Sequence, residues 1–140
     1  MSDRHFQLRL HCRYAQPDNA IAGLQVEQHT VDGWRPFVLN QLTPGFDIFV
    51  YSMLTCQHTY FRLNCAERGL QLTGADGEVE LSTDEDWNLQ RLRVAVNAQL
   101  AGGEPDQATL DYIKQRMLQC PVSKNTRPIA DTEVSLRFEG

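Results

Sequence analysis

The sequence predicts an α+β fold, in which antiparallel sheets pack on a long central helix and a second helix. Changes in apolar periodicity support this prediction. The first forty residues alternate apolar and polar side chains, whereas apolar residues recur at helical spacing between Phe46 and Arg68. Alternation then returns, before a second amphipathic helix from about Asp106 to Leu118. A chain of 140 residues is expected to form one domain, 1–140, because it can bury one core but not two comfortable ones.

Residues 1–41 are predicted to form an N-terminal β meander. From Phe6 to Tyr14 every second side chain is apolar, which is typical of a strand with one buried face. The turn residues 16–19 separate this strand from a second one, expected at about Gly23 to Val31. A third, short strand is expected from about Trp34 to Leu39.

A long central helix is predicted over 44–69. Pro44 precedes the segment and Gly69 ends it, which matches the start and stop signals of a helix. Apolar residues cover much of the helix circumference. We therefore expect this helix to be central rather than superficial.

Residues 70–101 are predicted to form strands. Two short ones, 70–72 and 79–81, would pair around a turn at Ala75-Asp76-Gly77, and a stronger one would follow from Leu92 to Leu100. A second helix is predicted over 105–119. The segment 120–140 contains a Cys-Pro motif and a last strand, Val134 to Phe138, which gives the order βββ, α, βββ, α, β.

The charge distribution argues against nucleic-acid and membrane partners. The net charge is −5, and the lysines and arginines are scattered rather than clustered. No basic stripe suggests an anionic membrane surface, and no apolar stretch is long enough to span a bilayer. Four cysteines in a chain without a signal-peptide pattern indicate a reducing compartment, so we expect a cytoplasmic protein.

Two of the four cysteines are candidates for chemistry. Cys56 lies in the middle of the long helix, and Cys120 opens the run Cys-Pro-Val-Ser-Lys, 64 positions later. Cys56 has either a structural role in the core or, beside a cation, a reactive thiolate. Cys120 either caps a new helical turn that begins at Pro121 or simply ends the preceding helix. Cys12 and Cys65 are expected to be core residues.

A metal site is the competing use of cysteine and histidine. The four histidines form no pair with the spacing of zinc ligands, and only Cys56-x-His58 comes close. We therefore expect no metal, and the sequence signals no flavin or haem.

Three local sequences accompany this order of elements. Pro44 precedes the long helix that carries Cys56, the helix ends in the run 66–70 (Ala-Glu-Arg-Gly-Leu), and the second helix runs into 120–124. In this combination the chain resembles the OsmC/Ohr family of thiol-dependent hydroperoxide reductases. The resemblance covers about Pro44 to Phe138 well and the first forty residues in outline.

The resemblance implies a mechanism and an assembly. Cys56 matches the cysteine that attacks the peroxide, and Cys120 matches the one that resolves the resulting sulfenic acid as a disulfide. Family members are intertwined homodimers, in which a Glu and an Arg hold the first thiolate. Here Asp47 is the only acid near the Pro, and on a straight helix it would project about 180° away from Cys56. Arg13, at the end of the first strand, is the candidate for the Arg.

The expected function is therefore a thiol-dependent peroxidase that reduces organic hydroperoxides and is restored by a dithiol reductant, in defence against oxidative stress. The site residues would be Cys56, Cys120, Arg13 and Asp47. Because the Glu and Arg patterns of the family are not reproduced, two alternatives stay open. One is a non-catalytic dimer that binds a small ligand, and the other is a redox sensor in which a disulfide changes binding.

Overall fold

The structure is a computed structural model that describes residues 3–127 together with 131, 133, 135 and 137. It contains five strands and three helices within these residues. In chain order they are β1 (Arg4–Ala15), β2 (Ala20–Thr30), β3 (Gly33–Pro36), α1 (Gly45–Glu67), β4 (Gln71–Thr83), β5 (Leu89–Gly102), α2 (Gln107–Met117) and α3 (Pro121–Lys124).

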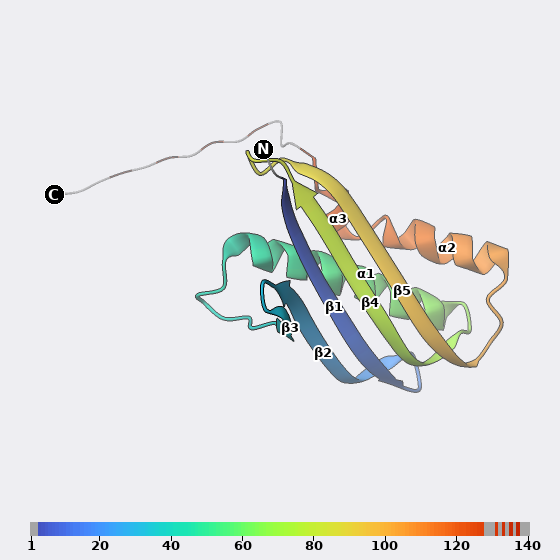
Figure 1. The fold of residues 1–140 in the computed structure, drawn as a ribbon. Helices are drawn as coiled ribbons and strands as arrows, with labels where there is room; N and C mark the ends of the chain where they lie inside the picture. Colours follow the sequence, from blue (N-terminus) through green and yellow to red (C-terminus); the bar gives the residue numbers. More distant parts are fainter. Residues whose placement is uncertain (1–2, 128–130, 132, 134, 136, 138–140) are drawn as a thin grey trace.

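The strands form one antiparallel sheet in the order β3-β2-β1-β4-β5. All three helices lie on one face of this sheet, with α1 crossing behind the strands and α2 alongside it (Figure 1). The predicted α+β class, with an antiparallel sheet packed on a long and a shorter helix, is confirmed. The described helices include none that is long and apolar enough to cross a membrane.

The two faces of the sheet differ in polarity, as the alternation in β1 predicts. Leu8, Leu10 and Cys12 point toward the helices and are buried, while the residues between them are exposed. On the open face, Arg9 pairs with Glu27 of β2 at 2.7 Å. Only one face of the sheet is therefore available to hold the helices and the site between them.

The core lies between the inner face of the sheet and α1. Val50 and Met53 of α1 are buried there with Leu8, Val79 and Leu81 of the central strands. α2 packs against α1 rather than against the sheet centre, and Ile113 is its buried residue. The predicted central position of the long helix is therefore confirmed.

The strand pair predicted around Ala75-Asp76-Gly77 is wrong, because β4 passes through these residues without a turn. The Asp-Gly pair is accommodated because β1 and β5 supply ladder partners on both sides, with Gly77 opposite Leu10 and Val96. The Leu10 side chain lies 3.4 Å from where a Cβ of Gly77 would be, so the glycine makes room for a core leucine. One long strand therefore replaces two short ones. The strand predicted over 134–138 begins and ends on residues outside those described.

Candidate thiol site

Cys56 is held in the middle of α1 by a regular helix with well-defined ends. The helix starts after Pro44, whose carbonyl accepts the first backbone bond, from the Ile48 N–H at 3.1 Å. It ends at Gly69, whose φ of +78° lets the chain reverse, and the Leu70 N–H bonds to the Cys65 carbonyl at 2.8 Å. Cys56 is half-buried on the side of the helix that faces α3.

Cys120 is the N-cap of the short helix α3. Pro121 occupies the first helical position, and the Cys120 sulfur accepts a hydrogen bond from the Ser123 N–H at 3.4 Å. The prediction that Cys120 caps a new helical turn is therefore confirmed over the alternative that it merely ends the preceding helix. The residue is fully buried.

The fold brings these two cysteines into contact across 64 residues of sequence. Cys120 and the Val122 backbone N–H both lie close enough to Cys56 to act on the pKa of its thiol. All four cysteines of the chain are free thiols in the structure. The arrangement is that of a reduced pair whose sulfurs are already neighbours.

The environment of Cys56 favours the thiol over the thiolate. Burial is the main reason that the pKa of Cys56 is raised, followed by its hydrogen bond to Cys120. The Val122 N–H acts in the opposite direction, because it donates to the charged form. Among the described residues, no lysine or arginine contributes to lowering the pKa of Cys56. The pair is therefore well placed but weakly activated within one chain.

Arg13 and Asp47 do not join the cysteines in the single chain. Arg13 is exposed on the face of the sheet opposite α1, where its guanidinium lies over Gly23 of β2. Asp47 lies in the first turn of α1, and within the described residues no hydrogen bond or ion pair connects it to Cys56 or Arg13. The activating roles expected of these two residues stay predictions.

Cys12 and Cys65 are buried, as expected of core residues, at 0% and 2% exposure. Burial raises the pKa of Cys65 to about 12 and also raises that of Cys12. Both thiols are therefore inert by position and by protonation state.

A buried polar pair between β1 and α1 was not foreseen from the sequence. The Tyr14 hydroxyl and His58 Nε2 lie 2.6 Å apart, and both side chains are buried. Burial, with the nearby Arg62 charge, lowers the pKa of His58 to about 4 and so keeps the ring neutral. His58 thus bonds to the sheet rather than forming a ligand pair with Cys56, and no three metal-ligating side chains gather among the described residues. The nearest signal in the sequence is that both residues fall on the inward phase of their elements, but it does not pair them.

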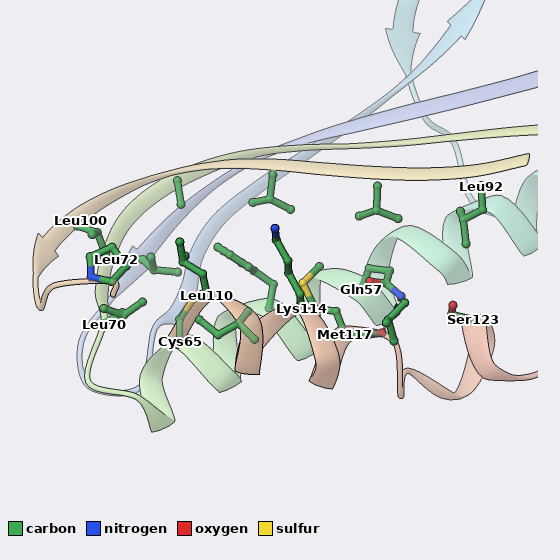
Figure 2. A pocket seen from close by; sticks show the side chains of 17 residues that line it. Gln57, Cys65, Leu70, Leu72, Leu92, Leu100, Leu110, Lys114, Met117 and Ser123 are labelled. Carbon is green, nitrogen blue, oxygen red and sulfur yellow. Dashed lines mark hydrogen bonds between the residues drawn. The ribbon is translucent and has the colours of Figure 1, made fainter. Parts of the chain in front are cut away.

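An apolar groove of about 630 Å³ lies close to this region, and its lining includes Cys65 but neither Cys56 nor Cys120. It lies between the inner face of β5 and the helices α1 and α2, and Lys114 reaches into it (Figure 2). Gln57 and Ser123, which are sequence neighbours of the thiol region, line one end, while Leu72 and Leu100 line the other. The groove is suited to an apolar ligand, and Gln57 at one end of it is the residue next to Cys56 in the sequence.

The fold and the adjoining thiols define an α+β protein with a two-cysteine site. The model of a protein family, described as OsmC-like protein, matches residues 40–135, which is more than half of the chain. The chain belongs to this family, and the resemblance predicted from its sequence is confirmed.

A solved structure supports the same fold. It is the crystal structure of an OsmC-like hydroperoxide resistance protein from Jannaschia sp. CCS1, with a TM-score of 0.64. The match covers 96% of this chain and 94% of the other, at 10% sequence identity. No curated protein sequence matches the chain.

Proposed function

We propose that this protein is a thiol-dependent peroxidase that reduces organic hydroperoxides through Cys56 and Cys120. The Cys56 thiolate attacks the distal peroxide oxygen and the O–O bond breaks, which gives a Cys56 sulfenic acid and, after protonation, an alcohol. The Cys120 thiol then displaces water from the sulfenic acid and forms a Cys56–Cys120 disulfide. A dithiol reductant then reduces the protein disulfide by thiol–disulfide exchange. The reductant is oxidised to its own disulfide, and both cysteines return to thiols.

The contact between the two thiols carries this proposal. A sulfenic acid on Cys56 would form beside the buried thiol of Cys120, which already acts on the pKa of Cys56, so condensation between these two residues is the expected next step. The apolar groove beside the site supports an organic rather than an inorganic peroxide, because its lining favours an apolar substituent.

The test is intact-mass analysis of the reduced protein after treatment with cumene hydroperoxide. We expect the wild-type protein to lose two hydrogens as the Cys56–Cys120 disulfide forms, and to consume peroxide repeatedly when dithiothreitol is present. Cys56→Ser should abolish both reactions, and Cys120→Ser should stop at a trappable sulfenic acid. Cys12→Ser is the matched control, since this buried thiol lies in β1, outside both the pair and the groove lining. Two intact thiols in the wild-type protein under excess peroxide would exclude the catalytic function.

The raised pKa of Cys56 favours one alternative, a redox sensor that oxidises slowly and whose disulfide changes binding. This alternative predicts disulfide formation without turnover when excess dithiol is supplied. A non-catalytic ligand binder predicts neither reaction and an apolar ligand held in the groove. Turnover with dithiothreitol therefore separates the peroxidase from both alternatives, and disulfide formation, read by intact mass, separates the sensor from the ligand binder.

We also propose that two copies of the chain associate through the apolar face between β5 and α2. The inward side chains of β5 are only half-buried, and Leu118, the residue that follows α2, is 68% exposed beside them. Because this face also lines the groove, the second copy would cover the open side of the groove and remove its apolar surface from water. Light scattering should give about 32 kDa, twice the chain mass of 16.0 kDa.

Leu118→Glu tests this interface without disturbing the core, and Val31→Glu is the control, because Val31 is fully exposed in a turn away from the groove. We expect Leu118→Glu to give 16 kDa monomers and the control to stay dimeric. A wild-type mass of one chain would overturn the proposed dimer. We further propose a cytoplasmic location, where a dithiol reductant is available.

A further inference from the structure

The Gln57 side chain bridges the two segments that carry the thiols. Gln57 follows Cys56 on α1, is only 5% exposed, and donates from Nε2 to the Met117 carbonyl oxygen at 3.0 Å. The same oxygen accepts the backbone N–H of Cys120 at 3.1 Å. One carbonyl therefore connects the residue next to one thiol with the backbone of the other.

Pro121 leaves the Met117 carbonyl able to accept this donor in addition to the Cys120 N–H. In a continuing α-helix, the carbonyl of residue 117 would accept the N–H of residue 121, but proline has none. Met117 is also the last residue of α2, where backbone carbonyls lack helical partners. The Gln57 amide supplies a buried donor at the point where the chain leaves α2 for Cys120.

We infer that Gln57 is a positioning residue that fixes the approach of Cys120 to Cys56. It acts through the Met117 carbonyl, by holding the turn 117–120 at a set distance from α1. Disulfide bonds form only within a narrow range of Cβ–Cβ separations, about 3.5–4.5 Å, so a small drift of this turn weakens the pair. The inference rests on the proposed function for its role in turnover, but the pairing of the thiols can be measured without peroxide.

The test measures the Cys56–Cys120 disulfide at equilibrium. The protein is incubated with mixtures of reduced and oxidised dithiothreitol, and the oxidised fraction is read by intact mass, with Cys12→Ser and Cys65→Ser in every variant. Oxidised dithiothreitol accepts two electrons and two protons as the protein disulfide forms. The ratio of oxidised to reduced dithiothreitol at half-oxidation therefore gives the effective concentration of the two protein thiols relative to that of the two dithiothreitol thiols. Gln57→Met keeps the apolar packing and removes the donor. We expect it to lower the effective concentration by about threefold to tenfold, as for one lost hydrogen bond.

Asn64→Leu is the matched control. Asn64 lies seven residues further along α1, on the same face of the helix, and is also 5% exposed. Its amide contacts α2 as well, since Oδ1 accepts from Arg116 Nε at 3.3 Å. We expect this control to keep the wild-type disulfide equilibrium, because its bond is to the side chain of Arg116 and not to a backbone atom of the turn 117–120.

The disulfide equilibria of the two variants decide whether Gln57 positions Cys120. An unchanged equilibrium in Gln57→Met, or an equal fall in Asn64→Leu, would overturn it, the second because general docking of α2 would then explain the effect. Gln57→Glu, whose carboxylate cannot donate, carries the same test if circular dichroism shows that Gln57→Met is unfolded. If peroxide leaves the wild-type thiols intact while the dithiothreitol equilibria differ as expected, the proposed function fails and the positioning role of Gln57 stands.

Discussion

The buried histidine of α1 makes the stability of the protein depend on pH. His58 has a pKa of about 4 in the folded chain, compared with 6.5 for the free side chain. As the pH falls below 6.5, the unfolded chain binds a proton that the folded chain excludes, so stability is full above pH 6.5 and is lost toward pH 4. The whole difference is about 3 kcal/mol, of which about 2 kcal/mol is lost between pH 7 and pH 5.

The perturbation that isolates this effect is His58→Gln, which cannot titrate but keeps a hydrogen-bonding group opposite Tyr14. Urea unfolding at pH 7, 6 and 5 gives the free energy of unfolding of each protein at one fixed concentration. We expect the wild-type advantage over the variant to shrink by about 2 kcal/mol from pH 7 to pH 5. His5→Gln, which changes an exposed histidine, should keep the wild-type slope. Parallel pH profiles for wild type and His58→Gln would refute the assignment of a neutral, buried His58.

Three further outcomes follow from single contacts. Cys120→Ala should lower the pKa of Cys56, read from alkylation rate against pH, because it removes a hydrogen bond and a neighbouring charge that disfavour the thiolate; an unchanged midpoint would contradict the contact. Native Cys65 should resist iodoacetamide at pH 8 while Cys56 reacts, as peptide mass mapping would show. Gly103→Ala should destabilise the fold more than Gly33→Ala. Both glycines have positive φ, which costs an alanine about 1–2 kcal/mol, but only at Gly103 would the new Cβ lie 2.5 Å from a backbone oxygen, that of Gly69. Equal losses in urea unfolding would rule out the clash.

The fold could be predicted where the local pattern and the tertiary environment agree. The alternation in β1 and the apolar circumference of α1 both reflect burial, so each element was found with nearly its observed bounds. The prediction failed for β4 because Asp76-Gly77 has the composition of a turn. Its role as a strand depends on partners at both edges and on the space that Leu10 needs over Gly77, and neither is visible in the local sequence.

The site was predictable only where it depends on neighbouring residues in the sequence. Pro121 made the cap role of Cys120 one of two alternatives in the sequence, and the structure shows that this is the one adopted. The Tyr14–His58 pair and the bridge from Gln57 each depend on two segments more than forty residues apart, so no local pattern announces them. Buried polar residues on an otherwise apolar helix face are the nearest signal, because each must find a partner when it leaves water.

Pairing and activation of the thiols are separate properties of this protein. Pairing is built within one chain. Cys56 comes from α1, Cys120 is the N-cap of α3, and the Val122 N–H of α3 lies near Cys56. Activation of Cys56 is not built within one chain. Burial and the neighbouring thiol both raise the pKa of Cys56, and Arg13 lies on the other face of the sheet. Proximity raises the rate of disulfide formation once a sulfenic acid exists, but does nothing for the first attack on peroxide. The slow step of the proposed reaction is therefore the oxidation of Cys56, and a group that stabilises its thiolate would raise turnover more than any change at Cys120.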